Sequence, residues 1–260
     1  MSLINKTKAE SYKDLLQMDN NNGGITTAAA KVKDGRGTES CISLSDDIFM
    51  IQPKNDNTTS TFRVTTKTGT NLFIVDTTNE TINAGTTLRP VNTQVQLFGV
   101  NSTSAMPTST NWTALPCPAQ RVQGMIEGAD GGTPATSFTI DSYADDMVSV
   151  MWYLPFNITI DACHVWFGGD ESSGDRTEFS VMSYAVVTTS GSTGGDLSSG
   201  TEHCSSPLVT AGLGNEQAHY QLQTIDIADV DAGRAVLAFV KCDGNNSDLS
   251  VNMQLVYHCR

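Results

Sequence analysis

An aromatic-x-valine repeat in a stretch with few apolar residues is the feature that most constrains the fold of this chain. Phe62–Val64 and Phe73–Val75 carry the same pattern eleven residues apart, separated by turn-forming Thr, Lys, Gly and Asn residues. Such segments favour strands, but they contain too few apolar side chains to bury a strand pair by themselves. The pattern therefore predicts that identical copies of the chain pack together, as in a fibre.

The charged residues are divided unevenly between the two halves of the chain. Residues 1–130 contain 11 basic and 12 acidic residues, whereas residues 131–260 contain 4 basic and 16 acidic residues. An acidic half lacks the positive surface that nucleic-acid binding needs, so we expect no nucleic-acid partner. The negative charge also favours solubility and repulsion from anionic membranes.

Two features bear on where the protein is made. No apolar run approaches the ~20 residues that a helix needs to span a bilayer. Residues 1–7 lack the apolar core of a signal peptide. We therefore expect a protein that is made in the cytosol, is not exported by the classical route and is not inserted into a membrane.

The N-terminal segment carries the signature of a short helix. Thr7–Glu10 forms a capping box, and Tyr12, Leu15 and Leu16 follow at helical spacing. Asn20–Gly24 is expected to end the helix. Because a helix this short is marginal in water, we expect its apolar stripe to dock on a partner protein, on copies of the chain or on its own domain.

The strand patterns predict an all-β protein with four parts. Residues 1–45 form an anchor with the short helix, 46–100 a repetitive β stalk, 101–118 a linker and 119–260 a knob. The stalk is expected to trimerise around one axis. The core of this trimer is expected to consist of Phe62, Val64, Phe73, Val75 and Ile82. A small single-chain β-sandwich remains the alternative for this stalk.

The knob has longer strands and a higher apolar content than the stalk. Ala235–Val240 is a nearly continuous apolar run, typical of a buried central strand, and Val251–Tyr257 alternates apolar and polar residues. Several such strands separated by turns predict an antiparallel β-sandwich of jelly-roll type. About 140 residues are enough for such a domain to bury a core of its own.

Signatures of catalysis and of cofactor binding are absent from the sequence. The G-x-S-x-G, H-E-x-x-H and P-loop motifs do not occur, and no spacing supports a Ser/His/Asp triad. We therefore expect a non-enzymatic protein without a cofactor. The six cysteines form no C-x-x-C pair and are expected to be buried free thiols, with a disulfide or a metal site as the alternatives.

Two further sets of residues are candidates for ligand binding. Acidic, glycine-containing loops supply possible calcium ligands, although their spacing does not match an EF-hand and solvated turns are the alternative: Asp170, Asp175, Asp243 and Asp248. Several aromatic side chains are candidate sugar-stacking platforms if they are exposed, and core residues otherwise: Trp112, Trp152, Tyr153, Trp166 and Phe167.

Four segments of the chain carry a resemblance to a known family: Ala9–Asn20, Val32–Thr38, Leu72–Gly85 and Ile227–Val240. The first two are similar to the anchor regions, the third to a stalk unit and the fourth to late strands of the jelly-roll knob of virion fibre proteins of tailed bacteriophages, especially marine ones. The resemblance implies a homotrimer with its N-terminus on the particle, a β stalk and an outward knob. The chain lacks the long shaft of a main tail fibre.

The leading hypothesis is thus a homotrimeric fibre or spike of the virion, made in the host cytoplasm. Its expected partners are copies of itself, other capsid or tail proteins and a host cell-surface glycan that the knob would bind. A capsid decoration or head-fibre protein without a receptor is the second hypothesis. A carbohydrate-active enzyme is the third.

Overall fold

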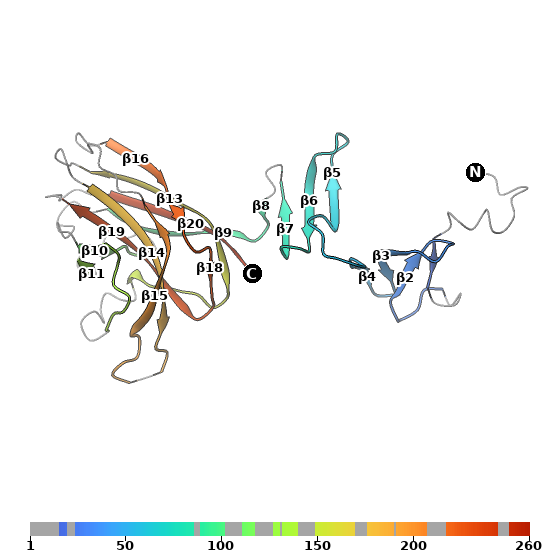
Figure 1. Ribbon diagram of the computed structural model, residues 1–260, viewed down its shortest axis with the longest axis horizontal. Coiled ribbons are helices and arrows are strands. Elements are labelled where there is room, and N and C mark those ends of the chain that lie inside the picture. The colour runs from blue at the N-terminus through green and yellow to red at the C-terminus, as the bar shows by residue number, and fades with distance from the viewer. Residues whose placement is uncertain are drawn as a thin grey trace, which may run out of the picture. The chain divides into compact units, whose positions relative to one another are not determined.

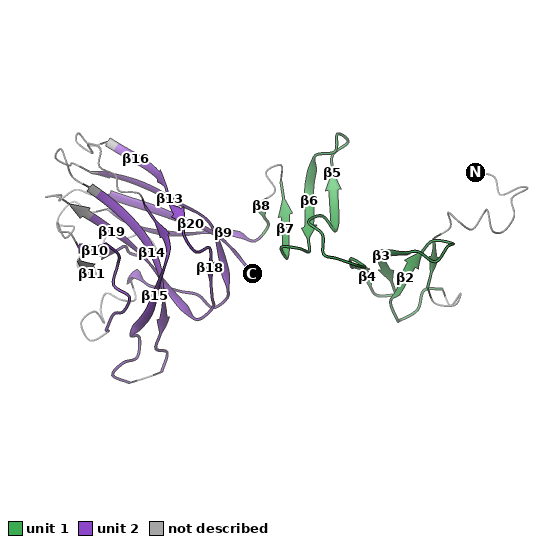
Figure 2. Cartoon of the chain, viewed as in Figure 1, with its two compact units in different colours: residues 1–91 green, residues 92–260 purple. Residues whose placement is uncertain are grey.

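The protein is described here from a computed structural model, in which every element with described bounds is a β-strand (Figure 1). The structure describes residues 16–19, 24–85, 89–101, 111–117, 127–130, 132–139, 149–169, 176–189, 191–206, 217–243 and 250–260. The predicted all-β class is confirmed. The chain divides into two compact units, Met1–Val91 and Asn92–Arg260 (Figure 2). Among the described residues, no helix has the length and apolar character needed to cross a membrane.

The first sheet of the N-terminal unit contains four short antiparallel strands in chain order. They are β1 (Gln17–Met18), β2 (Ala30–Lys33), β3 (Glu39–Leu44) and β4 (Phe49–Ile51). The carboxylate of Asp34 holds the β2–β3 turn by accepting the amide N–H groups of Thr38 and Arg36, each at 2.9 Å. These bonds lower the pKa of Asp34, because they stabilise its ionised form.

The predicted end of the N-terminal helix is wrong. Gln17 and Met18 form β1 and pair with Lys33 and Val32 of β2. A short isolated helix gains little stability in water, whereas the edge of β2 offers backbone hydrogen bonds to an extended segment. Gln17 and Met18, which the sequence pattern placed in the last turn of a helix, therefore belong to a strand.

The second sheet of this unit also consists of four antiparallel strands in chain order. They are β5 (Phe62–Thr65), β6 (Asn71–Asp76), β7 (Thr81–Ala84) and β8 (Arg89–Pro90). Gly69 closes the β5–β6 turn at a φ of 89°, which favours glycine. Asp76 organises the β6–β7 turn by accepting hydrogen bonds from the backbone N–H groups of Asn79 and Thr78 and from the side-chain N–H of Asn79. The pKa of Asp76 is lowered, mainly because the backbone N–H of Asn79 stabilises the ionised carboxylate.

The C-terminal unit contains a seven-stranded and a five-stranded antiparallel sheet. The larger sheet has the order β11 (Glu127–Asp130), β10 (Asn111–Ala114), β19 (Arg234–Asp243), β14 (Arg176–Val186), β15 (Leu197–Ser205) and β17 (Thr224–Ile225), with β12 (Trp152–Tyr153) also paired to β19. The smaller sheet has the order β16 (Gln217–Leu222), β13 (Ile158–Gly169), β20 (Ser250–Cys259) and β9 (Thr93–Asn101), with β18 (Asp229–Val230) paired to β13. This unit is a β-sandwich, as predicted.

The core of the sandwich lies between its two sheets, and a second apolar cluster covers the other face of the larger sheet. The main core combines Phe98 and Val165 from the smaller sheet with Phe179 from the larger one. The second cluster includes Phe239 of β19 together with Phe138, which lies outside the sheet strands. Because both of its faces are covered, β19 is buried from Ala235 to Val240, as the continuous apolar run predicts.

A β-bulge in β13 explains a change in its apolar pattern. Ile158 and Ile160 point into the core, and after the bulge Cys163 and Val165 do so. The extra residue shifts the alternation from even to odd positions, so that one strand keeps the same face on the core along its length.

The observed division of the chain differs from the expected one. The first sheet continues through β4 to Ile51, beyond the expected end of the anchor at residue 45. Strand β9, expected in the stalk, pairs with β20 along Thr93–Asn101 and belongs to the C-terminal unit. Strand β10 starts at Asn111, inside the expected linker. Short apolar segments carry no local sign of which sheet they join, because the partner strand can be distant in sequence.

Candidate functional site

The register of the second sheet brings the five expected stalk residues onto one face. Phe62 pairs with Val75, which pairs with Ile82, and Val64 pairs with Phe73. Directly opposed residues of neighbouring strands point to the same side of a sheet. The sequence repeat thus becomes two parallel rows of apolar side chains, which we call the stalk face.

Among the described residues, the apolar side chains of the stalk face are largely exposed. Phe62, Val64 and Ile82 are 39%, 46% and 43% exposed, and the rings of Phe62 and Phe73 contact each other edge-on at a centroid distance of 6.1 Å. Exposed apolar patches of this kind mark interaction surfaces.

The described part of the N-terminal unit has almost no apolar core. Among its described residues, the buried apolar side chains are Val32 and Ile74. The first sheet repeats the arrangement of the second, because Ile42 opposes Ile51 and Leu44 opposes Phe49, whose side chain is 64% exposed. The described residues of both sheets thus bury little apolar surface and expose several large apolar side chains, which are typical of an interaction surface.

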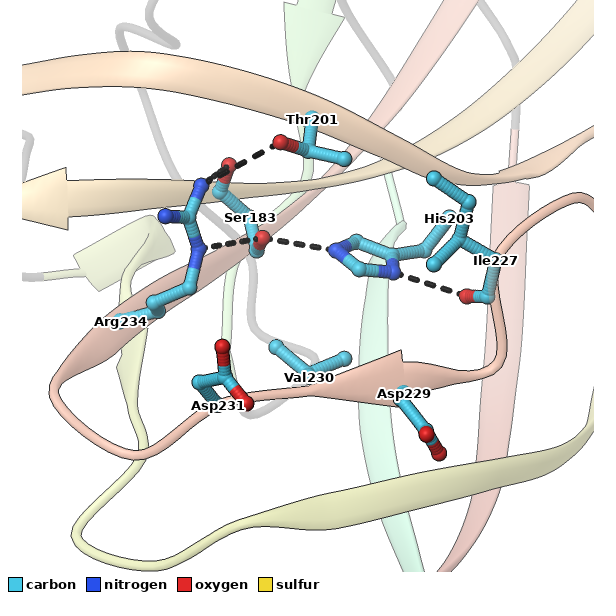
Figure 3. A pocket seen from close by; sticks show the side chains of 8 residues that line it. All are labelled: Ser183, Thr201, His203, Ile227, Asp229, Val230, Asp231 and Arg234. Atoms are coloured by element: carbon cyan, nitrogen blue, oxygen red, sulfur yellow. Dashed lines mark hydrogen bonds between the residues drawn. The ribbon is translucent and has the colours of Figure 1, made fainter.

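A hollow in the C-terminal unit brings together three polar side chains from separate strands (Figure 3). Oγ of Ser183 lies 2.7 Å from Nε2 of His203, and Nδ1 of His203 lies 2.8 Å from the carbonyl oxygen of Ile227. Since a carbonyl only accepts, Nδ1 carries the proton and Nε2 accepts the hydroxyl of Ser183. Nε of Arg234 donates to Oγ of Ser183 at 2.8 Å.

The protonation state of His203 follows from its surroundings. Burial lowers its pKa because the imidazolium loses hydration; the bond to the Ile227 carbonyl acts in the opposite direction, and the Arg234 charge lowers the pKa further. The imidazole is therefore neutral at pH 7, consistent with its role as an acceptor for Ser183.

A serine that donates to a histidine is also the start of a nucleophile–base pair. Here, however, Ser183 is fully buried, so that an acyl substrate has no access to its oxygen. Arg234 donates a hydrogen bond to that oxygen, and it also donates to the backbone carbonyl oxygens of Ser183 and Ser199, at 2.8 and 2.7 Å. The arrangement ties strands β14, β15 and β19 together, which is a structural role.

The remaining charges around the hollow already have partners. Asp229 and Asp231 lie 3.0 and 3.6 Å from the guanidinium of Arg260, and Asp229 also accepts the hydroxyl of Thr159. The volume of the hollow is about 140 Å³, below the ~300–1,000 Å³ of small-molecule sites. Within the described part of the chain, no three acidic, histidine or cysteine side chains come together as a metal site.

Several predicted site residues fall outside the described residues. These are Tyr12 and Leu15 of the anchor and the acidic residues Asp170, Asp175 and Asp248. Asp243 ends β19 opposite Arg176, and its side chain is not among those described. Leu16, the third anchor residue, is 74% exposed next to β1.

The candidate sugar platforms separate into buried and exposed rings. Trp112 and Phe167 are buried, and Trp152 packs against the main core. Trp166 is 50% exposed and Tyr153 is 43% exposed. Only the exposed rings remain available for stacking.

The cysteines whose side chains are described are free thiols. Cys163 and Cys204 are buried, which confirms the prediction for this pair, whereas Cys117 and Cys259 are half-buried and Cys41 is exposed. Burial raises the pKa of Cys117 to about 11.

No protein-family model, curated protein or solved structure matches the chain. The geometry of the stalk face and of the sandwich is therefore the basis for a function. Sequence patterns located the stalk face, since its residues repeat locally. They missed the contacts among Ser183, His203 and Arg234, which come from strands far apart in the chain and carry no local motif.

Proposed function

We propose that the protein is a non-enzymatic structural protein of a phage virion, a homotrimeric fibre or spike held on the particle by its N-terminal segment. The uncovered stalk face carries this proposal. An otherwise folded sheet with two apolar rows on its surface needs a second layer, and copies of the same chain supply one of matching chemistry.

Copies of the chain fit the stalk face better than a charged partner does. The positions of β5, β6 and β7 on this face are occupied by phenylalanine, valine, isoleucine and Ala84, and Arg89 of the edge strand β8 pairs with Ala84. The first 130 residues are also almost neutral, with 11 basic and 12 acidic residues, so the copies repel one another little. The trimeric state, rather than a dimer, follows from the resemblance to virion fibres.

The sandwich is the outward knob in this proposal, with a jelly-roll type of chain path. Both of its sheets contain neighbouring strands that are distant in sequence, such as β9 beside β20 and β19 beside β14, as long crossover connections require. Its own core makes it independent of the stalk. Its acidic composition favours a solvent-facing position, where it would meet a ligand on the host surface.

The second candidate function is a capsid decoration or head-fibre protein without a receptor. The described strands before residue 92 form two sheets of four short strands, which favours a short projection over a long shaft. Imaging of particles labelled through the knob distinguishes tail from capsid. Normal adsorption combined with reduced particle stability after deletion of the gene would select the decoration role.

The oligomeric state tests the main proposal. Light scattering of the purified full chain should give three times the 27.8 kDa of one copy. A mass of one copy at micromolar concentration would refute self-association through the stalk face. A stable dimer would refute the trimer and leave self-association intact.

A further inference from the structure

The outer face of the five-stranded sheet presents an ordered set of uncharged side chains. Strand register places them in two neighbouring rows across β16, β13, β20 and β9, the first being Tyr220, Trp166, Asn252 and Gly99, and the second Leu222, His164, Gln254 and Leu97. Their neighbours along the strands, including Val165 and Met253, point into the core and anchor the sheet. We call these two rows the aromatic face.

Two rings on the aromatic face are exposed and held in place. Trp166 and Tyr220 are each 50% exposed, with ring centroids 4.9 Å apart. The hydroxyl of Tyr220 lies 2.8 Å from Nδ1 of His164, whose ring stacks on that of Tyr220. Because the rings are already fixed by each other and by His164, a ligand that stacks on them does not have to order them.

Amide groups lie directly beside these rings. Asn252 is the cross-strand partner of Trp166, and Gln254 is that of His164. Nε2 of Gln254 lies 3.5 Å from Oδ1 of Asn252, so the two amides are adjacent. An amide both donates and accepts hydrogen bonds, and a sugar hydroxyl does the same.

We propose that the aromatic face binds a neutral glycan, with the apolar side of a pyranose ring stacked on Trp166 and Tyr220 and its hydroxyls bonded to the amides of Asn252 and Gln254. A pyranose presents C–H groups on its ring faces and hydroxyls around its rim. Adjacent aromatic and amide groups match these two kinds of surface. That this glycan belongs to a host cell surface rests on the proposed function; the stacking site itself does not.

The charges of the unit favour a neutral ligand. Residues 131–260 contain 16 acidic and 4 basic residues, yet neither row of the aromatic face contains Asp, Glu, Lys or Arg. Stacked nucleic-acid bases would bring phosphates, for which these rows offer no cation. Acidic sugars would likewise lack a cation on these rows and would be repelled by the net charge of the unit.

The composition of the aromatic face also separates it from a self-association surface. The rows of the stalk face in β5, β6 and β7 contain only apolar side chains, whereas the aromatic face contains two amides, an imidazole and a phenol hydroxyl. Burying these polar groups against a second copy would cost hydration unless each found a partner. The two faces thus favour different occupants, a copy of the chain for the first and a glycan for the second.

The test screens the full chain against an array of immobilised neutral gluco-, galacto- and manno-oligosaccharides together with sialylated and sulfated glycans. Titration calorimetry with the best neutral glycan then compares the wild type with Trp166→Ala and with the double variant Asn252→Ala/Gln254→Ala. Tyr153→Ala is the control, since this ring is 43% exposed but belongs to the other sheet. Thermal melting verifies that each variant is folded.

We expect binding of at least one neutral glycan, a loss of affinity of about tenfold or more in Trp166→Ala, and wild-type affinity in Tyr153→Ala. The site would be overturned if the wild type bound only anionic glycans or no glycan. It would also be overturned if Trp166→Ala bound neutral glycans as tightly as the wild type does. A Trp166→Ala chain that dissociates into single copies would overturn it too, because the face would then be an interface. Light scattering of the same samples separates the two proposals, since a monomer that binds neutral glycan refutes only the trimer.

Discussion

Strands β6 and β19 carry similar apolar residues but lie in opposite environments. In β19, Phe239 is fully buried, because β19 is a central strand with an apolar layer on each face. In β6, Phe73 and its cross-strand partner Val64 lie on the stalk face, where Val64 is 46% exposed. Among the described residues, the apolar side chains of β19 are covered, whereas several of those in the N-terminal unit are exposed, which is why the proposed assembly is placed there.

Truncation of a buried ring in β19 should have the largest effect. Phe239→Ala is expected to lower the free energy of unfolding of the C-terminal unit by about 3–5 kcal/mol, since it removes packing on a closed core and leaves a cavity. Urea unfolding followed by tryptophan fluorescence measures this, because Trp112, Trp152 and Trp166 all lie in this unit.

The matched control for this change is Phe49→Ala in β4, where the ring is 64% exposed. It should leave the same fluorescence transition within about 0.5 kcal/mol of the wild type. Equal losses in the two variants would contradict the contrast between a closed core and an open sheet.

A charge placed on the stalk face should have the next largest effect. Val64→Glu is expected to raise the dissociation constant of the assembly at least about 100-fold, because an unpaired carboxylate would be buried between copies. Sedimentation equilibrium over a range of concentrations measures this constant.

Arg63→Glu is the control for the stalk face, since it places a carboxylate at the preceding residue of β5, which pairs regularly with Ile74 on the other side of the sheet. It should leave the assembly unchanged. If Arg63→Glu dissociates the assembly and Val64→Glu does not, the copies pack on the opposite face.

The smallest effect is expected from the titration of His203. Its pKa is lowered in the folded protein, so the unfolded chain binds a proton more readily, and stability present above the unfolded pKa of about 6.5 is lost as the pH falls. The urea midpoint of the C-terminal unit should therefore decrease from pH 7 to pH 5. The decrease should be smaller in His203→Gln; an unchanged slope would show that other groups cause the acid sensitivity.

Local patterns predicted the strands and the stalk face because both depend on neighbours in the chain. Alternation at Phe62–Val64 and Phe73–Val75 identified one shared face, and the run Ala235–Val240 identified a central strand. The end of the N-terminal helix was mispredicted, since an apolar stripe at helical spacing does not reveal that β2 offers Gln17 and Met18 an edge. The assignment of β9 to the stalk failed for the same reason, because its partner β20 lies at the other end of the chain.

By itself, the sequence determined the all-β class, the acidic composition of the second half and the apolar rows of the stalk, since each follows from composition or from a period of two residues. Only the tertiary structure decided which apolar residues are covered, that Arg234 holds Ser183 and His203 in place, and that Trp166 lies exposed between Tyr220 and Asn252. Those facts depend on strand pairings between distant segments. The free energy of such pairings comes from burying apolar side chains between sheets and from pairing neighbouring strands. No local pattern specifies which distant segments supply these contacts.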